Sequence, residues 1–181
     1  VAGCPLRDTI TRDVTAAVTF LQHQPGVDPS RIGVLGLSMG GEEAVGAAAA
    51  SKAIRAVVAE GATNRTAADK AGFIPGGVAG AIQRVLDRLT YGTAAVLSSA
   101  PQPRTLHSAI ARASSTRFLL IAGSQAVDEP QAMAYLRTAA PERVQTWTVP
   151  GATHVHGLAT SPAEWTAQVI SFLDRSLAST G

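Results

Sequence analysis

Apolar and polar positions along the first third of the chain predict a helix, a strand, a second helix and a second strand. Apolar residues recur at spacings of four and three between Leu6 and Leu21, which predicts a helix with one apolar face. A proline- and glycine-rich break follows, and residues 31–37 then form a short apolar run typical of a buried strand. The alanine-rich residues 39–53 favour a helix, and residues 54–62 predict the next strand.

The same alternation returns after a less regular middle segment. Further helices are predicted over 78–92, 105–114, 130–140 and 162–177, and further strands over 117–123 and 143–151. Four apolar strands that alternate with helices predict an α/β fold: a mostly parallel sheet with helices on both faces. The length suggests a single domain over residues 1–181. Because ligands of such sheets bind at the carboxyl ends of the strands, functional residues are expected in the loops that follow them.

Composition excludes several classes of function. The net charge is +2, no run of Lys or Arg is present and 4% of residues are aromatic, so a nucleic-acid-binding surface is not expected. The one cysteine, Cys4, cannot form an internal disulfide, and no His, Cys or Asp cluster has metal-ligand spacing, so neither a metal nor a cofactor is expected. No apolar stretch reaches the roughly 20 residues of a membrane span. The first residues also lack the pattern of a signal peptide, although targeting signals can lie upstream, and the cytoplasm is the default expectation.

The stretch Gly36-Leu37-Ser38-Met39-Gly40 lies between a predicted strand and a predicted helix and matches the G-x-S-x-G nucleophile elbow. The serine backbone of such an elbow is strained, so Gly36 and Gly40 are expected because the turn leaves no room for side chains. The turn exposes the Ser38 hydroxyl beside the first turn of a helix. The Met39 N–H is therefore expected to stabilise an oxyanion.

Other glycine-rich turns fit this stretch less well. A dinucleotide-binding turn requires a glycine at the position of Ser38, and a phosphate-binding P-loop requires a lysine that the stretch lacks. A purely structural turn and an inactive descendant of an enzyme remain as alternatives to a catalytic serine.

A nucleophilic serine needs a base, and His154 and His156 follow the last predicted strand. His154 is preferred because it lies in a tight turn directly after the strand, whereas His156 lies further along and either lines the pocket or is exposed. His23 and His107 are expected at the surface.

Acidic residues near these loops include two neighbouring candidates for the third member of a triad. The loop after the third strand offers Asp128 and Glu129, of which one is expected to orient the imidazole and the other to cap the next helix. Glu42 and Glu43 are expected at the positive end of a helix dipole. Glu60 either faces the pocket or makes a buried structural bond.

These motifs resemble the α/β-hydrolase superfamily, in particular dienelactone-hydrolase and prolyl-oligopeptidase-like members and the carboxyl domain of acyl-CoA thioesterases and bile-acid acyltransferases. The resemblance rests on "RDVTAAVTFLQHQPGVDPSRIGVLGLSMGGE", "IRAVVAEGA", "FLLIAG" and "WTVPGATHVHGL". It implies Ser38 as the nucleophile and His154 as the base. It also favours Glu129 over Asp128 as the acid, although classical members place an aspartate closer to the strand end.

The chain departs from the family at its amino-terminal side. A full α/β-hydrolase has further strands before the helix that precedes the elbow, and they carry the second oxyanion N–H. No stretch here corresponds to them, which predicts the carboxyl-terminal portion of the fold with an unpaired sheet edge. The missing strands are expected in an absent amino-terminal segment or a second chain, unless this is a reduced version of the fold.

The predicted function is that of a serine hydrolase that cleaves an ester, thioester or related acyl bond of a small molecule through an acyl-enzyme. Residues 63–104 are expected to form a cap over an apolar acyl pocket. Two alternatives are an incomplete or inactive domain that serves as a binding or assembly module, and an acyltransferase that uses the same triad.

Overall fold

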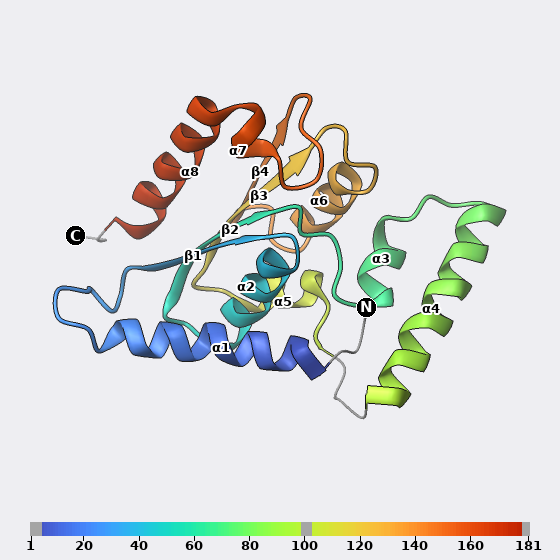
Figure 1. Ribbon diagram of the computed structural model, residues 1–181, viewed down its shortest axis with the longest axis horizontal. Coiled ribbons are helices and arrows are strands. Elements are labelled where there is room, and N and C mark those ends of the chain that lie inside the picture. Colours follow the sequence, from blue (N-terminus) through green and yellow to red (C-terminus); the bar gives the residue numbers. More distant parts are fainter. Residues whose placement is uncertain (1–4, 99–102, 179–181) are drawn as a thin grey trace.

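The computed structural model describes residues 5–98 and 103–178; of residues 5–11, 94, 95 and 98 it describes the backbone alone. Cys4 lies outside the described residues. The elements, shown in Figure 1, are α1 (Pro5–Gln22), β1 (Ile32–Leu37), α2 (Met39–Ala50), β2 (Ile54–Glu60), α3 (Ala67–Phe73), α4 (Val78–Ser98), α5 (Leu106–Arg112), β3 (Arg117–Gly123), α6 (Glu129–Arg137), β4 (Val144–Val149), α7 (Gly157–Thr160) and α8 (Pro162–Leu177).

The strands form one four-stranded sheet in the order β1-β2-β3-β4, and every neighbouring pair is parallel. The predicted α/β fold with a parallel sheet is therefore confirmed. Each predicted strand agrees with an observed one to within two residues at both ends; β2 and β4 each end two residues earlier than predicted. The short helices α3 and α7 were not predicted. Helix α3 nevertheless begins with a capping box, in which the Thr66 and Asp69 side chains each accept the other's backbone N–H.

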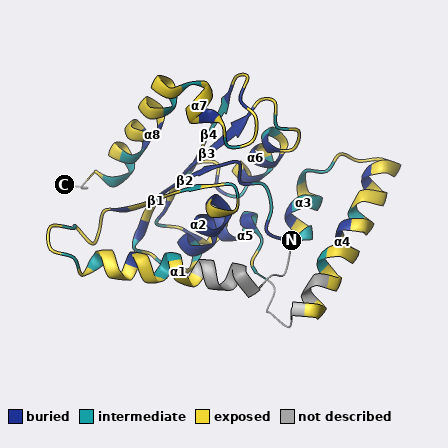
Figure 2. Ribbon diagram, in the orientation of Figure 1, coloured by how far each residue is buried: buried dark blue, intermediate teal, exposed yellow. Residues whose placement is uncertain are grey.

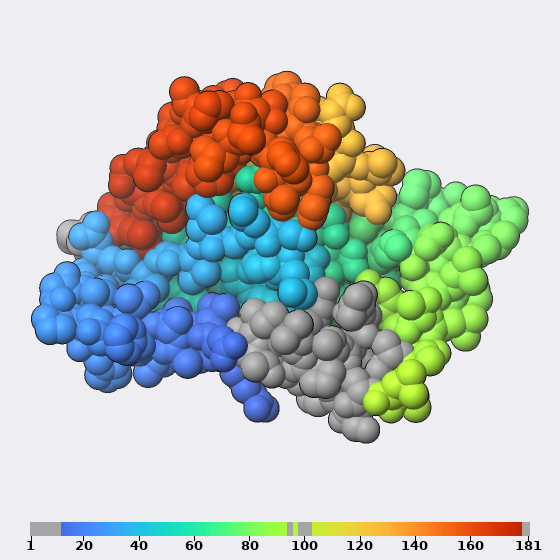
Figure 3. All heavy atoms as spheres, viewed as in Figure 1, coloured from blue at the N-terminus to red at the C-terminus, as the bar shows by residue number. Residues whose placement is uncertain are grey.

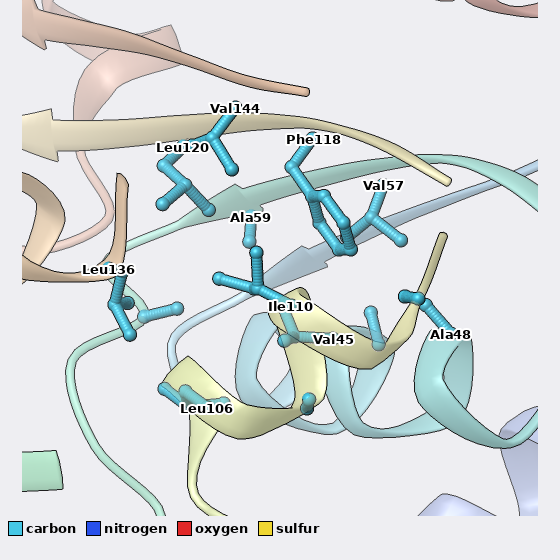
Figure 4. Packing of buried hydrophobic residues seen from close by; sticks show 14 of the residues in the cluster. Val45, Ala48, Val57, Ala59, Leu106, Ile110, Phe118, Leu120, Leu136 and Val144 are labelled. Carbon is cyan, nitrogen blue, oxygen red and sulfur yellow. The ribbon is translucent and has the colours of Figure 1, made fainter. Parts of the chain in front are cut away.

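Helices cover both faces of the sheet, as Figure 1 shows. On one face, α1, α2, α5 and α6 pack their apolar side chains against the strands. Figure 4 shows this layer, in which Phe118 and Leu120 of β3 point towards Ile110 of α5. On the other face, α8 contributes Val169 and Phe172 to a second buried cluster. Burial of both faces explains why β2 and β3 are almost continuously apolar.

Strand β1 lies at one end of the described sheet and pairs there with β2 alone. Its burial alternates, and the side chains of Leu35 and Leu37 are 45% and 46% exposed. The described sheet thus has an unpaired edge at β1, as predicted, and an unpaired edge is a template for pairing with another strand.

Helices α3 and α4 lie to one side of the sheet and its covering helices (Figure 1). Lys70 of α3 forms an ion pair with Asp87 of α4 at 3.2 Å, and Asn64 donates a hydrogen bond to the Tyr91 hydroxyl. Helix α4 is longer than predicted, and most of it is exposed in Figure 2, including its large apolar residues Val78, Ile82, Val85, Leu86, Leu89, Val96 and Leu97. Over residues 5–98 and 103–178, no helix combines the length and apolarity needed to cross a membrane.

Candidate active site

The carboxyl ends of the four strands bring the predicted functional loops to one edge of the sheet. Ser38 follows β1, Gly61 follows β2, Glu129 begins α6 after β3, and His154 lies in the loop after β4. In Figure 3 the orange atoms of the segment from β4 to α7 lie directly against the blue atoms of the segment from β1 to α2. Parallel pairing therefore places residues far apart in sequence side by side.

Ser38 occupies the sharp turn between β1 and α2. Its φ of 50° and ψ of −123° are uncommon for a residue with a side chain, so the turn stores backbone strain. The Ser38 N–H donates to the Glu60 carbonyl at 2.7 Å, and the Ser38 carbonyl accepts from Gly41 and Glu42 in the first turn of α2. Hydrogen bonds on both sides thus hold the strained residue at the helix start.

The glycines of the elbow differ in how much room they have. A Cβ on Gly36 would lie 2.5 Å from the Gly41 nitrogen, so the steric prediction holds there. For Gly40 the prediction is wrong, because a Cβ there meets no atom of the described residues within 4 Å. The close approach involves Gly41 instead, whose Cβ would lie 3.0 Å from the Gly36 carbonyl oxygen. The second glycine that the turn requires is thus the residue after the motif.

Gly36→Ala and Gly40→Ala are therefore expected to have different effects on the free energy of unfolding. Gly36→Ala forces the backbone of the elbow apart and should lower the free energy of unfolding by about 1–3 kcal/mol, the usual effect of overpacking. Gly40→Ala adds a methyl group in open space within α2 and should change stability by less than about 1 kcal/mol, in the stabilising direction. Urea unfolding of the two variants measures both effects, and equal losses would contradict the steric assignment.

Ser38, His154 and Glu129 form one hydrogen-bonded chain. The Nε2 atom of His154 lies 2.9 Å from Ser38 Oγ, and its Nδ1 atom lies 2.5 Å from Glu129 Oε1. The His154 side chain is 54% exposed and that of Glu129 only 4% exposed, so the imidazole is open to solvent and the carboxylate is enclosed. A serine, an imidazole and a carboxylate in this order can activate the hydroxyl as a nucleophile.

Of the two candidate acids, the structure brings Glu129 and not Asp128 to the imidazole. The second carboxylate oxygen of Glu129 accepts the Gly123 N–H at 2.7 Å, which ties the side chain to the end of β3. Asp128 is exposed and stands at the N-cap position of α6. The prediction that the other acid caps the helix is wrong for its side chain, since Asp128 makes no capping hydrogen bond.

Of the two candidate bases, the structure brings His154 and not His156 into hydrogen-bond distance of Ser38. Its Nδ1 atom lies 2.7 Å from the His154 carbonyl oxygen, and its exposed ring precedes α7. His23 is exposed at the end of α1, as predicted. His107 is half-buried and stacks on Tyr135 with a ring-centroid distance of 4.8 Å, so its predicted surface position is only partly correct.

Glu42 and Glu43 hold the loop that follows β2, a role that the helix-dipole argument missed. Glu42 accepts the N–H groups of Thr63 and Asn64, and Glu43 forms an ion pair with Arg65 at 2.7 Å in which both side chains are buried. For Glu60, the structure decides in favour of a buried structural bond, since both of its carboxylate oxygens accept hydrogen bonds from the protein.

Met39 is the first residue of α2. Its N–H therefore belongs to the first helical turn, whose N–H groups have no acceptor within the helix. This position beside Ser38 is what an oxyanion donor requires. In the described parts of the chain, no three His, Cys, Asp or Glu side chains are grouped as metal ligands.

Comparison with known proteins reveals both a family and a fold. The family model described as "BAAT / Acyl-CoA thioester hydrolase C terminal" matches residues 15–155. A 46-residue stretch is 48% identical to the thiohydrolase aneE of Aspergillus aculeatus; it is 25% of this chain and 14% of that protein.

Solved structures resemble the whole described fold. The α/β hydrolase GrgF from Penicillium sp. sh18 superposes with a TM-score of 0.69 at 16% identity, over 96% of this chain and 73% of GrgF. The esterase Pf2001 of Pyrococcus furiosus superposes with a TM-score of 0.61 at 24% identity, over 93% of this chain and 62% of the esterase. At these identities the likeness establishes the α/β-hydrolase fold.

Proposed function

Since the chain belongs to the BAAT / acyl-CoA thioester hydrolase C-terminal family and has an α/β-hydrolase fold, we propose that it carries the catalytic centre of a serine hydrolase. The bond cleaved is an ester, a thioester or a related acyl bond. The observation that carries this proposal is the hydrogen-bonded chain from Ser38 through His154 to Glu129.

In the first half of the reaction, Ser38 Oγ attacks the carbonyl carbon while His154 Nε2 takes the hydroxyl proton. Glu129 holds Nδ1 and stabilises the imidazolium. The Met39 N–H donates to the oxyanion of the tetrahedral intermediate. His154 then gives the proton to the leaving thiolate or alkoxide, which departs as a thiol or alcohol and leaves the acyl group on Ser38.

In the second half, water replaces the leaving group. His154 takes a proton from the water, whose oxygen attacks the acyl carbon, and the proton returns to Ser38 Oγ as the acid is released. One oxyanion donor raises kcat by a factor of about 10²–10³. The second donor, which the resemblance assigns to amino-terminal strands, would come from an amino-terminal segment or a second chain.

Residues 63–104 would form the cap that selects the acyl group. A pocket of about 410 Å³ lies between the end of α3, α4 and the loop before α6, and its apolar lining includes Phe73, Ile74 and Val127. Pockets of this size suit small ligands. The pocket reaches Asp128, which precedes Glu129 in the chain, and Ser38, Met39 and His154 are not among its lining residues.

Ile74→Trp is expected to shorten the preferred acyl chain because the indole fills part of this pocket. The ratio of kcat/KM for p-nitrophenyl octanoate to that for p-nitrophenyl acetate should fall by about 10-fold or more, as for the loss of contact with one or two methylenes. Exposed Val96→Trp on α4, outside the pocket, is the matched control. A ratio unchanged in Ile74→Trp would show that acyl chains bind elsewhere.

Fluorophosphonate labelling tests the proposed function directly. The reagent should add to Ser38 and to no other serine, which peptide mass spectrometry can locate, and the same protein should hydrolyse p-nitrophenyl acetate. A folded protein that forms no adduct on Ser38 and releases no nitrophenol would instead support a binding or assembly module.

Transfer of the acyl group to an amine or alcohol is a second candidate function, and the description of the family supports it because it joins BAAT with thioester hydrolases. Both reactions share the first half and differ in the acceptor of the acyl group. Turnover of an acyl-CoA in the presence of glycine distinguishes them, because a transferase yields N-acylglycine and a hydrolase yields the free acid.

A further inference from the structure

Glu60, the last residue of β2, contacts both sides of the proposed catalytic centre. We propose that it is a positioning residue that holds the His154 loop in register with Ser38, an inference that rests on the proposed function. The Glu60 side chain is only 2% exposed. A carboxylate buried to this degree is costly unless donors surround it, so its contacts indicate what it is for.

On the nucleophile side, the contact is through the backbone. The Glu60 carbonyl accepts the N–H of Ser38 at 2.7 Å, and the following N–H, that of Gly61, donates to the Ile121 carbonyl on β3 at 3.0 Å. The end of β2 therefore fixes the strained elbow residue relative to the centre of the sheet.

On the base side, the contact is through the carboxylate. Oε1 accepts the Gly157 N–H at 2.7 Å, and Oε2 accepts the indole N–H of Trp165 at 2.8 Å. Gly157 begins α7, three residues after His154, and Trp165 lies in α8. The carboxylate thus ties the end of the histidine loop to the helix that covers this face of the sheet.

Gly61 completes the arrangement by leaving room for the imidazole. It has a φ of 69°, and a Cβ there would lie 2.9 Å from His154 Cε1 and 3.0 Å from His154 Nδ1. The imidazole therefore packs against the backbone next to Glu60. The adjacent residues Glu60 and Gly61 thus set the positions of the nucleophile, the base and the base's loop.

These contacts predict what a loss of the carboxylate does to the reaction. Glu60→Gln keeps the shape of the side chain but replaces one carboxylate oxygen by an NH2 group. This NH2 group must then face the N–H of either Gly157 or Trp165, and two donors cannot form a hydrogen bond. The loop should then shift by a fraction of an ångström. Misplacement of a catalytic group by about 1 Å can cost about 10²-fold in rate. We therefore expect kcat to fall by about 10- to 100-fold, with KM changed by less than about twofold because substrate binding does not involve Glu60.

The conservative rescue uses Trp165. In the double variant Glu60→Gln/Trp165→Phe, the glutamine carbonyl can accept the Gly157 N–H while its amide faces a ring without a donor. The double variant should recover the kcat of Trp165→Phe. Exposed Glu164→Gln, which removes the same charge beside Trp165, is the matched control and should leave kcat unchanged.

The decisive measurement is kcat for p-nitrophenyl acetate per folded molecule, with the folded fraction taken from unfolding curves. A lower melting temperature with an unchanged kcat per folded molecule would mean a purely structural role and would overturn the proposal. If the wild-type protein shows no turnover, the proposed function is refuted, and this outcome is distinct from a failure of the Glu60 proposal.

A second measurement tests Glu60 whether or not there is turnover. The Nδ1–H of His154 bonded to Glu129 should give a downfield proton resonance in the wild-type protein. This resonance should shift or broaden in Glu60→Gln and return in the double variant, and the Gly157 amide should exchange faster in Glu60→Gln. An unchanged resonance and unchanged exchange in Glu60→Gln would overturn the proposal.

Discussion

Ser38→Ala is expected to lower kcat by about 10⁶-fold, since removal of a triad serine has an effect of that order in a serine hydrolase. The hydroxyl that bonds His154 is the atom that would become acylated. The alanine methyl group fits the same turn, so folding should be retained. The loss would then be chemical rather than structural.

The measurement is steady-state hydrolysis of p-nitrophenyl acetate together with fluorophosphonate labelling of the whole protein. Ser114→Ala is the matched control because Ser114 is exposed and precedes β3, at the amino end of a strand, whereas the site lies at the carboxyl ends. The control should keep full activity and full labelling. A Ser38→Ala protein that retains a tenth of the wild-type rate would show that another group carries the chemistry.

Glu129→Gln is expected to lower kcat by about 10⁴-fold, the effect of the equivalent change of an acid to its amide in a serine protease triad. The carboxylate accepts from both the Gly123 N–H and the imidazole Nδ1–H. A glutamine offers one carbonyl to these two donors. The glutamine then either loses the hydrogen bond from the Gly123 N–H or turns its NH2 group towards His154 Nδ1, which forces the imidazole into the wrong tautomer.

Asp128→Asn is the matched control for this prediction, because it makes the same chemical change one residue earlier. Asp128 is exposed and makes no capping hydrogen bond. With p-nitrophenyl acetate, whose acetyl group has no chain to fill the pocket that Asp128 lines, this variant should keep kcat to within about twofold, as surface substitutions generally do. Equal losses in the two variants, or a larger loss in Asp128→Asn, would contradict the assignment of Glu129.

The elbow and the order of elements could be predicted from the sequence because both are local. An apolar run, a serine between glycines and an alanine-rich helix specify a strand, a tight turn and a helix within 20 residues, Arg31 to Ala50. The parallel pairing follows from the alternation of strands and helices, whereas the strand order β1-β2-β3-β4 is seen only in the structure. The four-residue helix α7 escaped prediction because so few residues carry too little periodicity. Helix α3 is as long as α5, which was predicted, but has no large apolar residue before Phe73.

The choice of acid could not be predicted from the residues alone. Asp128 and Glu129 are adjacent and chemically alike, and one step along a helix start turns the side chain to another direction. The resemblance favoured Glu129, and in the structure the Gly123 N–H holds that carboxylate at the imidazole. The position of β3 relative to β4 decides this contact, and no local pattern encodes it.

The role of Gly40 and the contacts of Glu60 show the same limit. The motif suggests that both of its glycines are sterically required, but the space around Gly40 depends on what packs over the start of α2. Glu60 is an acidic residue at the end of an apolar strand, and its partners Gly157 and Trp165 lie 97 and 105 residues further along the chain.

The sequence by itself therefore determined the elements, the parallel α/β sheet and the position of the strained serine, because hydrophobic periodicity and turn chemistry act over a few residues. Tertiary structure alone decided which groups meet. Ser38 and His154 are 116 residues apart and His154 and Glu129 are 25 apart, and a distance of 2.9 or 2.5 Å between them depends on how the strands pack. Hydrogen bonds act only over such short distances, so the geometry of a site is set by packing.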